Sequence, residues 1–81
     1  MRLDLFLKTA RLVKRRTVAK ALCDEGRVLV DGRAAKAGAE VAPGQTITVL
    51  FGDRRRTVRV RAVPEEGKKA VDPSALTEPL E

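Results

Sequence analysis

The chain has 81 residues and a formal net charge of +6, with 17 Lys and Arg, 11 Asp and Glu, no His and one Cys. This length predicts one domain with a thin core and little room for an internal pocket. The missing His and lone Cys argue against His-based catalysis, an internal disulfide and a structural zinc site. We therefore expect no catalytic residue, no metal and no cofactor. No apolar run reaches the roughly 20 residues of a membrane span, which favours a cytoplasmic protein. The net positive charge favours a polyanionic partner.

The charge divides between a basic body and an acidic tail. Residues 1–63 hold 15 Lys and Arg against 6 Asp and Glu, a net charge of +9, whereas residues 64–81 hold two Lys against five acidic residues, a net charge of −3. The tail also contains three of the four prolines and lacks a sustained apolar period. We expect residues 1–63 to form the domain and residues 64–81 to be a mostly flexible acidic tail, with a short helical turn near Pro73–Leu76.

The first predicted element is a helix over about residues 3–10. Apolar side chains recur there at the spacing of one helix face, at Leu3, Phe6, Leu7 and Ala10. Asp4 lies in the first turn, where a carboxylate suits the helix dipole, and Lys8 follows one turn later as an ion-pair partner. We therefore expect a structural role for Asp4.

The second predicted element is a helix over about residues 15–25, which Gly26 ends as a left-handed cap. Its apolar stripe places Cys23 in the core as a small apolar residue; the other members are Val18, Ala19 and Leu22. The helix begins among three cations, Lys14, Arg15 and Arg16, where a Ser or Asp cap would be preferred. Because cations oppose the dipole at this end, the pattern favours a bound anion there.

Strands are predicted after the helices. Residues 28–30 lead into an Asp31-Gly32 tight turn, from which residues 34–36 return as a short strand. Pro43-Gly44 is typical of a type II turn. Residues 46–51 and 57–62 alternate between apolar and polar side chains and predict two strands around a hairpin loop at 52–55. Two helices followed by a small, mainly antiparallel sheet indicate an α+β fold.

The order of these motifs resembles the S4-type RNA-binding domain. The motifs are Arg2-Leu3-Asp4 at the first helix, the basic turn into the second, the run 26–32 (GRVLVDG) and the run 41–49 (VAPGQTITV). The resemblance covers about residues 1–52 and implies the S4-like (alpha-L) fold, in which two N-terminal helices pack on a small antiparallel sheet. Asp31 stands where Asn is commoner and Gln45 where Asp is commoner, and both keep a polar or turn-forming character.

The short stand-alone form, the Lys14–Thr17 turn and the following basic hairpin resemble the RqcP family, and the longer ribosome-associated heat-shock S4 proteins are similar. The resemblance implies a non-catalytic factor of ribosome-associated quality control. Such a factor binds rRNA and peptidyl-tRNA on obstructed large ribosomal subunits and supports C-terminal alanine tailing with an RqcH-type factor. A general RNA chaperone or RNA-binding regulator without a tailing role is the alternative, and an enzyme or enzyme subunit is a third hypothesis. We expect a monomer.

The candidate RNA-binding residues are cations near the start of the second helix and around the Asp31-Gly32 turn. They are Arg2, Arg11, Lys14, Arg15, Arg16, Lys20, Arg33 and Lys36. Packing of the two apolar helix stripes would gather the first six on one surface, where Arg16 is the leading candidate because the matching position is basic in both related families. An ordinary solvated helix face is the alternative interpretation.

A second basic run, Arg54, Arg55, Arg56, Arg59 and Arg61, either contacts RNA or protects an edge strand from pairing with other chains. The chain has only two aromatic side chains, Phe6 and Phe51, and both fall on apolar stripes. Base stacking is therefore not expected, and recognition of folded RNA through its shape and backbone is favoured.

Overall fold

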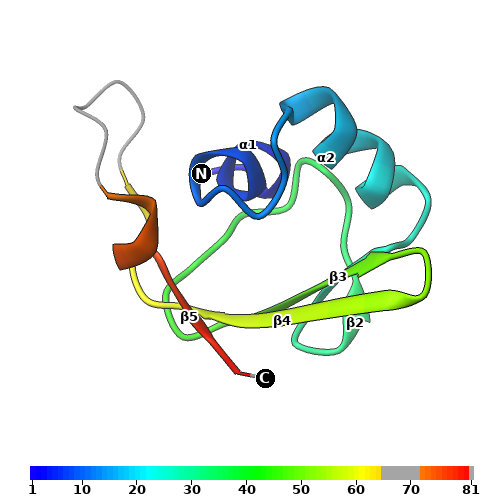
Figure 1. Ribbon diagram of the computed structural model, residues 1–81. Helices are drawn as coiled ribbons and strands as arrows, with labels where there is room; N and C mark the ends of the chain where they lie inside the picture. Colours follow the sequence, from blue (N-terminus) through cyan, green and yellow to red (C-terminus); the bar gives the residue numbers. More distant parts are fainter. Residues whose placement is uncertain (65–71, 81) are drawn as a thin grey trace.

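The computed structural model describes residues 1–64 and 72–80. Within them it has two α-helices and five strands on one sheet, with every neighbouring pair antiparallel and the strand order β2-β1-β3-β4-β5. Both helices lie on the same face of the sheet (Figure 1). The elements are α1 (Leu3–Thr9), α2 (Arg16–Asp24), β1 (Val28–Val30), β2 (Arg33–Ala34), β3 (Thr46–Phe51), β4 (Arg54–Val60), a 3-10 helix η1 (Pro73–Ala75) and β5 (Thr77–Pro79). The predicted α+β fold is confirmed.

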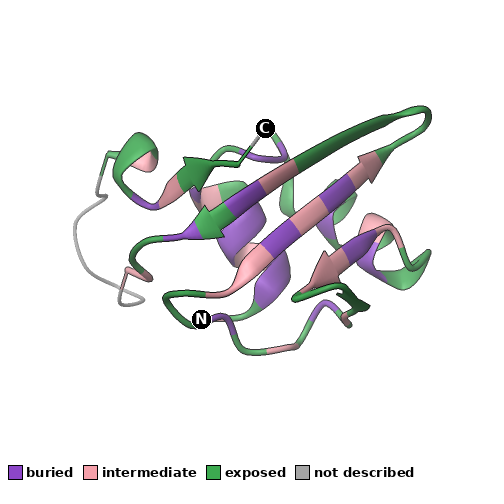
Figure 2. Ribbon diagram, turned by 90° about the horizontal axis from the view of Figure 1, so that it is seen from below, coloured by how far each residue is buried: buried purple, intermediate pink, exposed green. Residues whose placement is uncertain are grey.

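The core lies between the helices and the sheet. Strand β3 and residues 57–60 of β4 alternate between buried and more exposed residues, as Figure 2 shows, because successive side chains point to opposite faces of a sheet. Residues 54–56 of β4 are all exposed. Cys23 is 5 % exposed, which confirms its predicted place in the core. The most deeply buried apolar side chains come from both layers: Leu3, Phe6, Leu7, Ala19, Val28, Ile47, Val49, Val58, Val60 and Leu76.

The segment between β2 and β3 holds the N-terminus in place. The Leu3 N–H donates to the Ala39 carbonyl at 2.8 Å, and the Val41 N–H donates to the Met1 carbonyl at 3.0 Å. The terminal ammonium group lies 3.0 Å from the Glu40 carboxylate. Arg2, between these contacts, is therefore positioned by backbone pairing on both sides.

The C-terminal segment departs from the expected flexible tail. The predicted short helical turn is present as η1, and the Asp72 carboxylate caps it by accepting hydrogen bonds from the Ser74 N–H and hydroxyl. Beyond it, β5 adds an antiparallel strand to the edge of β4, and Leu76 is only 1 % exposed. Flexibility over 72–80 was therefore the wrong expectation. The composition of the tail does not show that Leu76 packs into the core or that the edge of β4 is open to a further strand. Residues 65–71 and 81 lie outside the described residues.

Candidate nucleic-acid interface

A buried carboxylate that binds two arginines forms the centre of the site. Asp4 is 3 % exposed. Its Oδ1 lies 3.3 Å from Nε of Arg2, its Oδ2 lies 3.3 Å from Nε of Arg16, and the Leu5 N–H donates to Oδ1 at 2.8 Å. The arginine side chains remain 49 % and 45 % exposed, so each keeps part of its guanidinium in solvent. We call Arg2, Asp4 and Arg16 the arginine clamp.

The clamp corrects the expected partner of Asp4. The spacing within α1 predicted an ion pair with Lys8, but the carboxylate faces α2 and binds arginines from outside its own helix. Burial raises the pKa of Asp4, but the hydrogen bonds from Arg16 and Leu5 and the positive charges of Arg16 and Arg2 outweigh it. The pKa therefore lies below its ordinary value, and Asp4 is ionised at neutral pH.

The N-terminal end of α2 adds backbone donors beside the clamp. Arg15 is the N-cap residue, with extended backbone angles and no side-chain capping bond, and the first turn of the helix contains no acidic residue. The poor capping predicted from the sequence is confirmed. The first N–H groups of α2 therefore remain available to an anion, and the helix dipole favours negative charge at this end.

Arg11 has an unusual backbone conformation. It follows the end of α1 with φ of 57°, in the left-handed region that Gly normally occupies after a helix. The Arg11 N–H donates to the Lys8 carbonyl and the Leu12 N–H to the Leu7 carbonyl, at 3.0 and 2.9 Å. The end of α2 has the same arrangement with Gly26, at φ of 73°. At the end of α1, an arginine is held where glycine would carry less strain.

The other predicted cations fall into two groups. Arg11 and Lys14 border a surface hollow of about 500 Å³ beside Lys8, and Lys20 lies one helical turn after Arg16. All six predicted cations of the helical part are exposed: Arg2, Arg11, Lys14, Arg15, Arg16 and Lys20. Of these six, only Arg2 and Arg16 belong to the arginine clamp, and the remaining two predicted cations lie on other elements. Arg33 lies on the edge strand β2, and Lys36 borders a hollow at the C-terminal end of α2.

The sheet divides the second basic run between its two faces. Arg56 is paired with buried Val49, and Arg54 with Phe51, so both arginines project on the face that the helices cover. Arg59 alternates with the buried Val58 and Val60 and lies on the opposite face. The basic run therefore does not form one continuous face of the sheet. Counting alternate positions back from the valines of β4 would have identified this division in the sequence.

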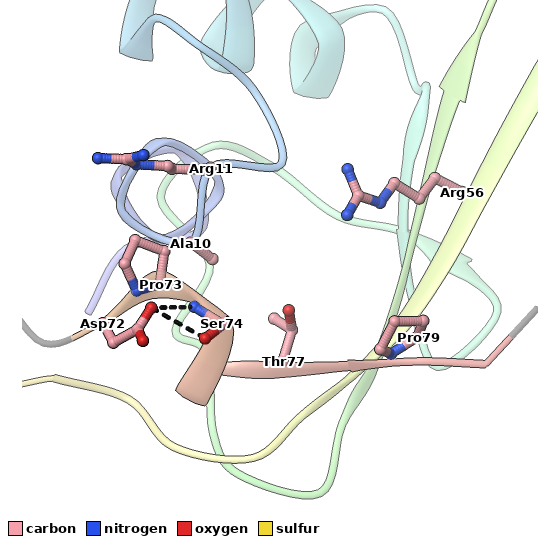
Figure 3. Close-up of a pocket in the computed structure, with 8 residues that line it drawn as sticks. All are labelled: Ala10, Arg11, Arg56, Asp72, Pro73, Ser74, Thr77 and Pro79. Atoms are coloured by element: carbon pink, nitrogen blue, oxygen red, sulfur yellow. Dashed lines mark hydrogen bonds between the residues drawn. The ribbon is translucent and has the colours of Figure 1, made fainter.

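Arg11 and Arg56 both line a third surface hollow. This hollow has a volume of about 360 Å³, and Ala10 and residues of the C-terminal segment line the rest of it (Figure 3). Asp72 lies in the same hollow. The hydrogen bond from the Ser74 N–H, followed by that from the Ser74 hydroxyl and by the positive charge of Arg11, lowers the pKa of Asp72. The C-terminal segment therefore shapes a surface beside the predicted interface.

Two apolar residues of the predicted stripes are exposed. Val18 on α2 is 46 % exposed and Phe51 at the end of β3 is 37 % exposed, whereas Phe6 is fully buried. The periodicity identified the apolar face of α2 and of β3. It did not show that Val18 and Phe51 lie where those faces extend past the core. Both aromatic residues lie on the predicted apolar stripes, but only Phe6 is buried there, and the Phe51 side chain is partly exposed.

Metal-ligand clusters and membrane-spanning helices are both missing from the described part of the chain. There, no three His, Cys, Asp or Glu side chains are grouped so that they could hold a metal ion. Across the same residues, none of the helices has the length and apolar character needed to cross a membrane.

Comparisons with known proteins identify the family of the chain. Residues 1–47 match the family model of the S4 domain. The RQC P-site tRNA stabilizing factor of Bacillus subtilis (strain 168) is 49 % identical over 69 residues, covering 85 % of this chain and 80 % of that protein. Heat shock protein 15 of Escherichia coli (strain K12) is 33 % identical over 78 residues, covering 96 % of this chain and 59 % of that protein.

Two solved structures share the fold. The trimeric structure of Vibrio cholerae heat shock protein 15 superposes with a TM-score of 0.84 at 28 % identity, covering 98 % of this chain and 80 % of that chain. The solution structure of the hypothetical protein HP1423 superposes with a TM-score of 0.81 at 33 % identity, covering 100 % and 98 % of the two chains. The chain thus belongs to the S4 domain family, in the group of short S4 proteins that includes the RQC P-site tRNA stabilizing factors.

Proposed function

We propose that this protein is a non-catalytic RNA-binding factor of ribosome-associated quality control. Its ligand is the large ribosomal subunit that carries a stalled peptidyl-tRNA, and its role is to stabilise that tRNA. The observation that carries the proposal is the arginine clamp at the uncapped end of α2, in a chain 49 % identical to an RQC P-site tRNA stabilizing factor.

The clamp suits the backbone of folded RNA. Asp4 occupies the Nε side of both guanidiniums, which leaves their terminal nitrogens for a phosphate or a base edge. A planar guanidinium that is already fixed loses less rotational freedom on binding than a free side chain. Together with the N–H groups of α2, the clamp forms a rigid donor surface that fits a structured phosphate backbone.

The finer part of the proposal concerns the partners and the outcome. We propose that the protein contacts large-subunit rRNA and peptidyl-tRNA, acts as a monomer in the cytoplasm and supports C-terminal alanine tailing by an RqcH-type factor. The test is reconstitution of tailing on obstructed large subunits with and without this protein. Tailing that proceeds equally well in its absence would refute the tailing role while leaving RNA binding intact.

Co-sedimentation with large subunits tests the site. Arg16→Ala removes one arm of the clamp, Arg16→Lys keeps the charge but loses the planar fork, and Arg59→Ala removes one charge from the opposite face of the sheet. We expect strong loss of binding for Arg16→Ala, partial loss for Arg16→Lys and little change for Arg59→Ala. Circular dichroism checks that each variant is folded. Equal losses for Arg16→Ala and Arg59→Ala would show that only net charge matters.

The salt dependence tests the number of contacts. If the six cations of the helical part each neutralise a phosphate, log affinity falls with log salt at a slope of about −4 to −5. A flat dependence between low and physiological salt contradicts a phosphate-binding interface.

The resemblance to heat shock protein 15 supports a second function. The fold match to the Vibrio cholerae protein, with a TM-score of 0.84, is compatible with an RNA-binding factor that has no tailing role. Competition between bulk RNA and large subunits carrying peptidyl-tRNA, at one salt concentration, distinguishes the two. Preference for the subunits supports the quality-control role, and comparable binding supports the general RNA-binding role.

A further inference from the structure

An apolar hollow adjoins the basic turn between the helices. It has a volume of about 500 Å³ and lies between this turn and the tip of the β3–β4 hairpin. Leu12 and Val13 are almost fully buried and also line the hollow, whereas Val18 and Phe51 are 46 % and 37 % exposed at its sides. Among the described residues, the large apolar side chains with the greatest exposure are these two and Leu80. Two of these three exposed side chains, Val18 and Phe51, therefore line the same hollow.

Strand geometry explains why the Phe51 ring is displayed. Phe51 follows Ile47 and Val49 on alternate positions of β3, so it shares their face of the sheet. Those residues are buried under the helices, but Phe51 lies where the hairpin extends past the core. Part of an aromatic side chain is thus exposed beside the start of α2.

The charge around the hollow selects its occupant. Lys14 and Arg15 form part of its lining, and no acidic residue does. Arg54 is the direct cross-strand partner of Phe51, which places a third cation on the same face. Arg15 also precedes Arg16 of the arginine clamp, so the hollow adjoins the proposed RNA surface. A group with an apolar, stackable face between two negative charges matches this arrangement, and an unpaired nucleotide has that chemistry.

We propose that this hollow binds an unpaired nucleobase of the RNA ligand, stacked on the Phe51 ring and packed against Val18, with the flanking phosphates on Lys14 and Arg15. The inference rests on the proposed RNA-binding function and adds a contact to it. The arginine clamp holds the RNA backbone, and the hollow selects RNA in which one base is available outside a helix.

Tryptophan fluorescence reports on the stacking directly, because the chain contains no Trp and no Tyr. The Phe51→Trp variant places a single indole at the hollow, and Leu80→Trp is the matched control at an exposed site after the edge strand β5. Each variant is titrated with three RNA hairpins: a fully paired one, one with a single bulged adenine, and one with an abasic nucleotide at the bulge. We expect quenching only for Phe51→Trp with the bulged adenine. Equal quenching of both variants, or equal quenching by all three hairpins, overturns the inference.

Affinity measurements keep this inference separate from the proposed function. Phe51→Ala should weaken binding of the bulged hairpin by about 5- to 150-fold, the effect of losing one stacked base, and leave the paired and abasic hairpins unchanged. Arg16→Ala should weaken all three. Unchanged affinity of Phe51→Ala for the bulged hairpin refutes the nucleobase contact and leaves the hollow to a protein partner, while the RNA-binding function stands. Failure of the unaltered protein to bind both these hairpins and large subunits carrying peptidyl-tRNA refutes both.

Discussion

The Asp4→Asn substitution tests whether the arginine clamp stabilises the fold. The amide keeps the shape of the carboxylate but loses its charge, and its NH₂ group faces arginine donors instead of accepting from them. The two arginines are about half exposed, so each ion pair contributes only about 0.2–1 kcal/mol. The misplaced buried donor adds about 1–3 kcal/mol. We expect a total loss of about 3 kcal/mol, which lowers the melting temperature of a domain of this size by at least about 10 °C.

The pH dependence follows from the lowered pKa of Asp4. Its pKa in the folded chain lies below the ordinary value of 3.8, so on acidification the unfolded chain takes up the proton first. The stabilisation is therefore complete above about pH 5 and is lost as the pH falls through the folded-state pKa. The Asp4→Asn variant has no such titration. The stability difference between the two proteins should shrink as the pH falls below about 4.

Urea unfolding followed by circular dichroism measures both effects. Asp53→Asn is the control, because it removes an exposed carboxylate from the β3–β4 turn and should change stability by less than about 0.5 kcal/mol. An Asp4→Asn variant as stable as the unaltered protein at pH 7 would refute the structural role of the clamp. A stability difference that stays constant down to pH 2 would refute the assignment of the charge to Asp4.

Three further changes test other parts of the structure. Arg11→Gly should leave stability unchanged or raise it by up to about 1 kcal/mol, because Gly suits the left-handed conformation. The same change should make the salt slope of RNA binding shallower by about 1. A loss of stability contradicts the strain assigned to Arg11. Leu76→Ala should cost about 2–5 kcal/mol because the side chain is buried, and a loss below 1 kcal/mol contradicts packing of the C-terminal segment. Burial raises the pKa of Cys23 to about 11, so thiol labelling at pH 8 should be at least about 100-fold slower in the folded than in the urea-unfolded chain; equal rates contradict its burial.

Local patterns predicted most of the fold. The apolar spacing of Leu3 and Phe6 identified α1, Gly26 marked the end of α2, and the Asp31-Gly32 turn is present with both residues at positive φ. Each of these signals depends on neighbours within a few residues of the chain. The resemblance to S4 domains then supplied the arrangement of the elements, which the family model and the solved structures confirm.

Contacts between distant segments were not predictable in this way. Spacing within α1 suggested Lys8 as the partner of Asp4. Local spacing contains no information about the arginines that reach the carboxylate from outside the helix. The packing of Leu76 depends on an edge of β4 that composition does not reveal. Likewise, strand alternation identified the face of Phe51 but not where the core ends. In each case the missing quantity was a tertiary contact.

Binding to defined ribosomal particles tests the central claim most directly. Labelled protein is equilibrated with large subunits that carry peptidyl-tRNA and, in parallel, with vacant large subunits at the same salt concentration. The proposed function predicts tighter binding to the loaded subunits, and it predicts that Arg16→Ala removes this preference while Arg59→Ala retains it. Equal affinity for loaded and vacant subunits, or a preference that survives Arg16→Ala, would contradict it.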